Sequence, residues 1–225
     1  LSDIKPEIQS GIPPLIEGKT LRIGIIGTGG RGGYLMKAMG FVNPDRIDEY
    51  TEKGKKDKYW EQYLEDFRAQ DNLNIKITAI CDVFDTNAEK GIAAGANVHR
   101  NGKGGKMDDA PKRYTTYKEL IASPDVDAVV IATPDHWHVP IALEAARNVK
   151  HVYCEKPLSW SVTETYEIRK TDKETGIVFQ LGHQGRQTEC YIVAKSLIKQ
   201  DVIGKISLIE VFSYRYDANG AWVYD

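Results

Sequence analysis

The segment IIGTGGRGGYL, residues 25–35, follows directly on an apolar run and is unusually rich in glycine. Its glycines have the spacing G-x-G-x-x-G, which binds the diphosphate of a dinucleotide when it lies between a strand and a helix. The first glycine permits a tight turn, the second lets the backbone approach the phosphates, and the third lets helix and strand pack closely. Backbone amides and the helix dipole then hold the anion. The predicted phosphate-binding loop consists of Gly27, Thr28, Gly29, Gly30, Arg31 and Gly32.

Around this loop, short apolar runs alternate with longer amphipathic segments. The runs are nearly apolar throughout, as in strands buried on both faces. Two S/T-x-x-E patterns, at 116–119 and 161–164, predict helix N-termini, and residues 138–148 have helical spacing. The alternation predicts an α/β fold, a doubly wound parallel Rossmann sheet. The expected strands are residues 21–27, 75–81, 127–133, 150–154 and 177–182.

The pattern also suggests a division of the chain. Residues 1–20 contain three prolines and no clear period, so we expect an extended N-terminal arm. Residues 21–182 form the Rossmann domain, interrupted by a polar insertion at 42–73 with a helix near 58–70, and by a Gly- and Lys-rich loop at 98–110.

From residue 183 the sequence pattern changes: a helix-like segment at 189–200 is followed by an alternating, strand-like run at 205–216. A lone strand cannot bury its faces. We therefore expect residues 183–225 to begin a second, α+β domain that is incomplete here. We further expect this to be a substrate and oligomerisation domain, through which the full-length protein forms a homo-oligomer, although the strand pattern alone does not indicate either role.

Composition excludes several classes of function. The net charge of −2 gives no reason to bind nucleic acid or an anionic membrane, and no segment resembles a transmembrane span. The lysine-rich stretch at 52–58 is flanked by acids and is interpreted as a solvated face. The three cysteines lack metal-ligand spacing, and the i, i+2 pair His136 and His138 has no evident third ligand, so no metal site is expected. The sequence does not decide whether the protein is cytoplasmic or exported to the periplasm.

An acidic residue ends the second expected strand. Asp82, in AICDVF, stands where dinucleotide-binding folds place a carboxylate that accepts hydrogen bonds from the adenosine ribose, although it also suits a simple strand-end cap. The insertion at 42–73 explains its long separation from the glycine loop. Val83 follows in place of an arginine, so we expect NAD rather than NADP.

Two further strand ends carry unusual sequence, ATPDHWH at 132–138 and CEKPLSWS at 154–161. Together with the glycine loop and Asp82, this set resembles the glucose–fructose oxidoreductase / inositol dehydrogenase (Gfo/Idh/MocA) family over residues 21–216. The EKP triplet after TP-x-x-x-H is the most specific part of the likeness. Asp135 departs from it, because the family often has Asn there.

The resemblance implies roles for individual residues. Lys156 would face both nicotinamide and substrate, Glu155 would contact the nicotinamide side or orient Lys156, and His183 would lie on the substrate side, where chemistry and packing are both open to it. Independently of the resemblance, the place of Arg31 in the glycine loop puts it either beside the diphosphate or in solvent. The remaining cofactor contacts would be Ala132, Thr133, Pro134, His138, Gln184 and Arg186.

Lys156 also has a role on physical grounds. Pro157 disfavours a helical conformation at Lys156 and keeps it extended at the strand end. An ammonium there stabilises the alkoxide-like oxygen that develops as hydride leaves carbon.

The resemblance implies an NAD-dependent oxidoreductase that acts on a carbinol of a sugar, cyclitol or glycoside. It also implies a further acid/base residue from the second domain. We therefore expect this chain to bind NAD but to turn over substrate poorly. Two alternatives are an NAD-dependent glycosidase or lyase that oxidises its sugar transiently, and a non-catalytic nucleotide-sensing module.

Overall fold

A computed structural model describes residues 18–99, 106, 107, 109–186 and 188–212. The chain divides into two compact units, residues 1–182 and 183–225. In the first unit, six strands form one sheet in the order β5-β2-β1-β6-β7-β8, and every pairing within it is parallel. The strands are β1 (Leu21–Ile26), β2 (Ile75–Cys81), β5 (Lys112–Tyr114), β6 (Ala128–Ile131), β7 (His151–Glu155) and β8 (Phe179–Gly182).

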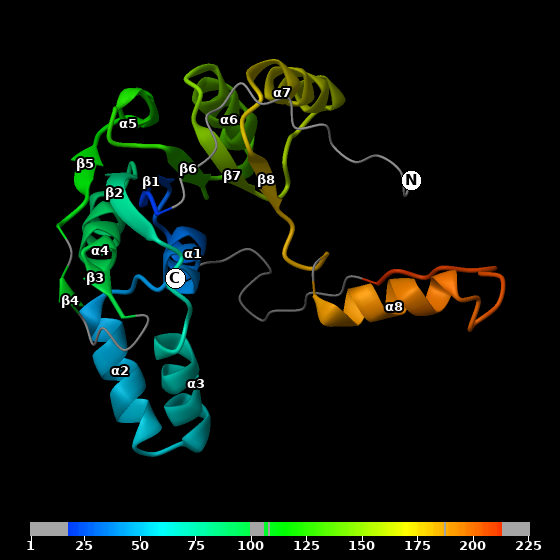
Figure 1. The fold of residues 1–225 in the computed structure, drawn as a ribbon, viewed down its shortest axis with the longest axis horizontal. Helices are drawn as coiled ribbons and strands as arrows, with labels where there is room; N and C mark the ends of the chain where they lie inside the picture. The colour runs from blue at the N-terminus through cyan, green and yellow to red at the C-terminus, as the bar shows by residue number, and fades with distance from the viewer. Residues whose placement is uncertain (1–17, 100–105, 108, 187, 213–225) are drawn as a thin grey trace. The chain divides into compact units, whose positions relative to one another are not determined.

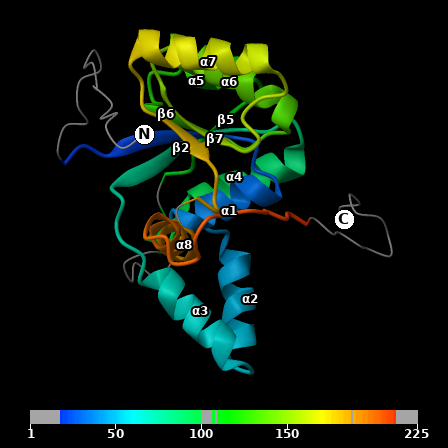
Figure 2. The ribbon, with the colours of Figure 1, turned by 90° about the vertical axis from the view of Figure 1, so that its right-hand side faces the viewer.

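Helices cover both faces of this sheet (Figure 1). Both ribbon views place α5 (Tyr117–Ala122), α6 (His138–Arg147) and α7 (Val162–Thr175) on one face, and α1 (Gly30–Ala38) and α4 (Asp85–Gly95) on the other (Figures 1 and 2). The order with its reversal at β1 is that of a doubly wound Rossmann fold, as predicted.

The core has two halves, one on each side of the sheet. One half packs Val129 and Ile131 of β6 against α6 through Ile141 and Ala142. The other packs residues of β1 and β2 against α1 and α4. Because strands β1 and β6 contribute to both halves, their nearly continuous apolar sequence is explained by burial on two faces.

Capping boxes fix two helix starts as the sequence predicts. Thr116 accepts a hydrogen bond from the Glu119 amide at the start of α5, and Ser161 accepts one from the Glu164 amide at the start of α7. In each case the glutamate side chain accepts from the backbone of the capping residue in return.

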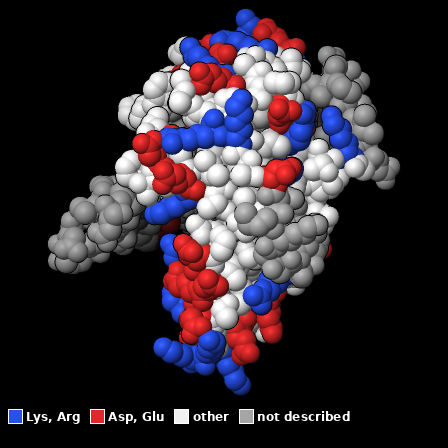
Figure 3. All heavy atoms as spheres, turned by 90° about the vertical axis from the view of Figure 1, so that its left-hand side faces the viewer, with Lys and Arg blue, Asp and Glu red and all other residues white. Residues whose placement is uncertain are grey.

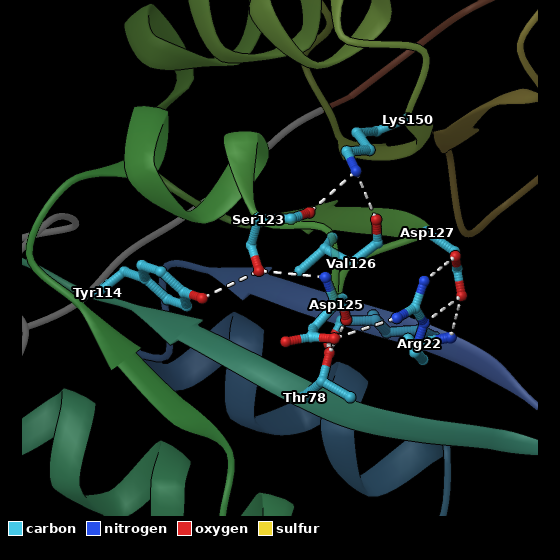
Figure 4. A network of polar contacts seen from close by, with 9 residues as sticks. Arg22, Thr78, Tyr114, Ser123, Asp125, Val126, Asp127 and Lys150 are labelled. Carbon is cyan, nitrogen blue, oxygen red and sulfur yellow. Dashed lines mark hydrogen bonds and ion pairs between the residues drawn. The ribbon is translucent and has the colours of Figure 1, made fainter.

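A polar network joins β1, β6 and β7 at the edge of the sheet opposite the glycine loop (Figure 4). Arg22 donates to both carboxylate oxygens of Asp127 at 2.7 and 3.0 Å, and it also pairs with Asp125 at 3.2 Å. The Lys150 ammonium donates to the carbonyl oxygens of Ser123 and Val126, at 3.0 and 2.7 Å. Burial lowers the pKa of Lys150.

The insertion after α1 is a helical hairpin of α2 (Pro44–Gly54) and α3 (Lys58–Arg68). Pro44 at its first position and the Asn43 cap explain why α2 begins there, although the sequence analysis anticipated only α3. Acidic and basic side chains are interspersed over the hairpin (Figure 3), and Lys53 and Lys55 pair with Glu49 and Glu52.

Other differences from the expected pattern are local. Strand β5 was not anticipated, because a three-residue edge strand leaves little periodicity. The predicted loop at 98–110 contains β4 (Lys106–Met107), which pairs with β3 (Asn97–Val98).

The second unit, described by itself, contains α8 (Glu189–Lys199) followed by a turn. The predicted strand at 205–216 is not formed over its described part, 205–212. An isolated strand has no partner for its backbone groups, which explains the difference. Residues 213–216 and the predicted arm up to residue 17 lie outside the described residues.

Candidate cofactor-binding site

Two of the loop glycines are required by close backbone packing. Gly27 has φ of +87°, and a Cβ there would lie 2.7 Å from the carbonyl oxygen of Ala132. A Cβ on Gly32 would collide with the carbonyl oxygen of Gly27. These contacts confirm the turn and packing roles predicted for the first and third glycines.

The middle of the loop is open. A Cβ on Gly29 would meet only the Asn87 amide nitrogen, at 3.4 Å, and one on Gly30 would meet nothing within 4 Å. Gly29 is the N-cap of α1 and supplies no side-chain cap. The first turn of α1 therefore has no side-chain acceptor for its amides and an open approach to them, which suits a phosphate group.

Asp82 anchors the loop to the end of β2. Its Oδ2 accepts hydrogen bonds from the Thr28 amide at 2.7 Å and the Thr28 hydroxyl at 3.2 Å, and its Oδ1 accepts one from the Phe84 amide at 2.9 Å. Asp82 therefore does cap the end of β2, which is one of the two roles considered for it. A carboxylate has about four lone-pair sites, so capacity for a ribose hydroxyl remains.

The sequence pattern did not predict that a cation, Arg113, lies near Asp82. Arg113, on the edge strand β5, pairs with Asp85, and this contact raises the pKa of its guanidinium, with a smaller contribution from Asp82. It was missed because β5 itself was missed. Val83, which follows Asp82 in place of an arginine, is fully exposed.

Glu155 and Arg31 form an ion pair. Arg31 Nη2 lies 2.6 Å from Glu155 Oε1, which also accepts a hydrogen bond from the Tyr153 hydroxyl at 3.1 Å. The Glu155 side chain is only 5% exposed, so a charged partner is needed there. The hydrogen bond to Glu155 raises the pKa of Arg31. Arg31 is therefore partly exposed and paired with a buried carboxylate, a partner that its own segment of sequence does not indicate.

His138 is enclosed by backbone. The residue is 1% exposed, with Nδ1 lying 2.7 Å from the carbonyl oxygen of Pro157 and Nε2 lying 2.9 Å from that of Thr133. Both ring nitrogens lie against backbone carbonyl oxygens, and the direct contact with a cofactor stays a prediction. His138 joins the loop after β6 to the loop after β7.

Lys156 is exposed and begins the loop after β7. Its amide lies 3.4 Å from Glu155 Oε2, whereas the other oxygen of that carboxylate is taken by Arg31. Ala132 and Thr133 are half-buried and Pro134 is exposed at the neighbouring end of β6. Lys156 and the segment 132–134 thus lie at the carboxyl ends of the strands, where ligands bind in such sheets.

The last three predicted site residues belong to the second unit. His183, Gln184 and Arg186 are exposed in the segment that follows β8. Their placement against Lys156 stays a prediction.

Two buried polar atoms support a ligand at this edge. Within the described part of the chain, four buried side-chain polar atoms lack a hydrogen-bond partner; Arg31 Nε and Thr133 Oγ1 belong to this edge, and Arg68 Nε and His99 Nε2 do not. Such atoms are rare in folded proteins unless a ligand or water satisfies them. With the open amides of α1 and the spare capacity of Asp82, the two at this edge form a donor and acceptor set that fits a dinucleotide.

A cavity of about 660 Å³ borders the glycine loop on its other side, between α1, α2 and α4. Its lining includes Gly29, Gly30 and Asn87 but neither Asp82 nor Lys156. Gly29 and Gly30, the open positions of the loop, therefore border this cavity, whereas Thr133 and Glu155 are not among its lining residues. No group of three or more metal-ligating side chains occurs among the described residues, and none of their helices is long and apolar enough to cross a membrane.

Comparison with known proteins identifies the family. The model of the Gfo/Idh/MocA oxidoreductase family, an NAD-binding Rossmann fold, matches residues 54–183. The chain belongs to this family. The resemblance seen in the EKP and TP-x-x-x-H motifs is confirmed, and the family description agrees with NAD as the cofactor.

Individual relatives of this Gfo/Idh/MocA chain have varied names. It is 31% identical over 137 residues to a 1,5-anhydro-D-fructose reductase of Ensifer adhaerens, covering 61% of this chain and 38% of that protein. It is 40% identical over 87 residues to a 2,7-anhydro-N-acetylneuraminate hydratase of Escherichia coli, covering 39% and 23%. A myo-inositol 2-dehydrogenase structure from Lactobacillus plantarum is similar with a TM-score of 0.57 and 26% identity, covering 84% of this chain and 43% of that one. The chain thus spans less than half the length of each.

Proposed function

We propose that residues 21–182 bind NAD across the edge of the sheet where β1, β6 and β7 end, and that the whole protein is an oxidoreductase acting on a carbinol of a sugar or cyclitol. The observation that carries the proposal is the glycine loop, where Gly27 and Gly32 are packed against backbone while Gly29 and Gly30 face open space. Bound NAD would supply the hydride acceptor.

The chain's own residues would position and polarise the reactants. Amides of the first turn of α1 would bind the diphosphate, and Asp82 would accept from the adenosine ribose. The exposed ammonium of Lys156 would donate to the carbinol oxygen and stabilise the negative charge that develops on it. His183, and a base from outside the described residues, would complete the proton transfer. The relatives named a fructose-derivative reductase and an inositol dehydrogenase support the substrate class.

Titration calorimetry with NAD, NADP and ATP tests the first part. We expect NAD to bind more tightly than NADP, because Asp82 would repel a 2′-phosphate. Absence of binding by either dinucleotide to folded protein would contradict the proposal.

Lys156→Met in the full-length protein tests the second part. We expect NAD affinity within about threefold of wild type and turnover lower by about 10²–10⁴-fold. Lys170→Met is the matched control, because Lys170 is an exposed lysine on α7. Equal turnover of the Lys156 variant and the control would remove Lys156 from the chemistry.

A second candidate is supported by the relative named a hydratase, because hydration involves no net oxidation. In that case NAD would stay bound and be regenerated within each cycle. Product analysis separates the two: NADH that accumulates with substrate indicates a dehydrogenase, whereas product without net NADH indicates the redox-assisted lyase or hydratase. A non-catalytic sensing module would show binding but leave every sugar unchanged.

A further inference from the structure

The ion pair of Arg31 and Glu155 connects two segments that are not neighbours in the sheet. Arg31 lies in the first turn of α1, directly after the loop that follows β1, and Glu155 ends β7. Strand β6 lies between β1 and β7, so the pair spans two strand spacings, about 10 Å. It crosses the edge where a dinucleotide lies in this fold class.

Neighbouring residues on β7 and β8 hold the ion pair of Arg31 and Glu155 in place. Tyr153 and Glu155 are two residues apart on β7 and therefore point to the same face, which is the face that α1 covers. Tyr153 donates to the oxygen that Arg31 binds. A Cβ on Gly182 of β8 would collide with the Tyr153 hydroxyl and lie 2.9 Å from Glu155 Oε1, so the glycine leaves room for the cluster.

The charges also fix where Arg31 stays. Glu155 is 5% exposed on its side chain and Arg31 is 32% exposed. Removing the guanidinium would leave a buried carboxylate without a charged partner, which is costly. Arg31 is therefore held at Glu155 and is not available to move onto a phosphate.

We propose that Arg31 is a positioning residue: through Glu155 it ties the phosphate-binding helix α1 to the loop that carries Lys156, and so fixes the separation between the diphosphate end and the nicotinamide end of the site. This inference rests on the proposed NAD function. Glu155 keeps Oε2, which lies beside the Lys156 amide, for the nicotinamide side of the site. The orphaned Nε of Arg31 is a further donor on this path.

The test compares ligands of increasing length. ADP, ADP-ribose and NADH are titrated calorimetrically into wild type, Arg31→Met and Arg31→Lys. Because ADP occupies only the diphosphate end, we expect Arg31→Met to leave its affinity within about threefold and to weaken NADH by about tenfold or more. Arg31→Lys keeps the charge but loses the planar fork and should be intermediate.

Arg147→Met is the matched control. Arg147 pairs with Glu167 at 3.1 Å between α6 and α7, and both side chains are about half exposed. All three ligands should bind this variant as they bind wild type.

Arg31→Met/Glu155→Gln separates positioning from stability, because it removes both charges and keeps a polar side chain beside the Lys156 amide. We expect its urea midpoint to recover relative to Arg31→Met while NADH binding stays weak. Recovery of NADH affinity along with stability would overturn the proposal, because the pair would then serve folding alone. An equal loss for ADP and NADH in Arg31→Met would also overturn it, because Arg31 would then be a phosphate ligand. Failure of wild type to bind any of the three ligands would instead refute the NAD function.

Discussion

His138 Nδ1 lies 2.7 Å from the carbonyl oxygen of Pro157, so a buried imidazole holds the loop that carries Lys156. The same ring reaches Thr133 through Nε2, at 2.9 Å. One side chain thus fixes two of the three loops that form the proposed site. The third, the glycine loop, is joined to Lys156 through Arg31 and Glu155.

His138→Ala should therefore destabilise the protein. The change leaves a cavity and removes the N–H that the imidazole donates to one of the two carbonyl oxygens, so we expect a loss of about 3 kcal/mol in the free energy of unfolding, measured with urea. His136→Ala is the control, because the His136 side chain is 54% exposed and should cost no more than about 0.5 kcal/mol. Equal losses for the two variants would mean that the contacts of His138 contribute little.

Gly30→Ala should separate folding from binding. The new methyl group meets nothing within 4 Å and lies in a helix, so stability should rise by about 0.5 kcal/mol or more. The same methyl group would stand in the opening above the first turn of α1, so NAD affinity should fall by about tenfold or more. Gly32→Ala, which collides with the Gly27 carbonyl, should lose about 3 kcal/mol or more of stability. Unchanged NAD affinity in folded Gly30→Ala would place the diphosphate elsewhere.

The Arg22–Asp127 pair predicts a pH dependence at the opposite edge of the sheet. The hydrogen bond that Arg22 donates to Asp127 lowers the pKa of the Asp127 carboxyl group from 3.8 to about 2. Because the folded pKa is the lower one, the stabilisation is present above pH 3.8 and is lost as the pH falls toward 2.

Asp127→Asn should accordingly cost about 1–2 kcal/mol at pH 7, and the gap from wild type should close between pH 4 and 2, as measured by urea unfolding at each pH. Asp125→Asn is a control that touches the same arginine, but the Asp125 side chain is 75% exposed, so its cost should be within about 0.5 kcal/mol. A gap that persists at pH 2 would assign the loss to packing.

Sequence reasoning predicted the features that depend on local pattern. The glycine loop, the apolar strands β1 and β2, and the capping boxes at Thr116 and Ser161 each encode their structure within a few residues. It failed where structure depends on partners: β5 forms because β2 supplies its hydrogen bonds, and residues 205–212 form no strand because none pairs with them.

The same distinction applies to the site. The positions of Gly27, Gly32 and Lys156 follow from spacing and strand ends. The ion pair of Arg31 with Glu155 joins residues 124 positions apart, and no property of either segment alone indicates the other. The burial of His138 likewise depends on the loops that enclose it, and its own segment of sequence does not indicate it.

The three cysteines give a final prediction that tests the packing. Burial raises the pKa of Cys81 to about 11 and that of Cys154 to about 12, whereas Cys190 is exposed. The thiolate is the reactive form, so Cys190 alone should react rapidly with an aromatic disulfide reagent in native protein. Cys190→Ser should abolish the fast phase, and urea should restore reaction at the other two. A second fast thiol in the Cys190→Ser protein would show that the sheet around β2 or β7 opens more readily than its buried cysteines imply.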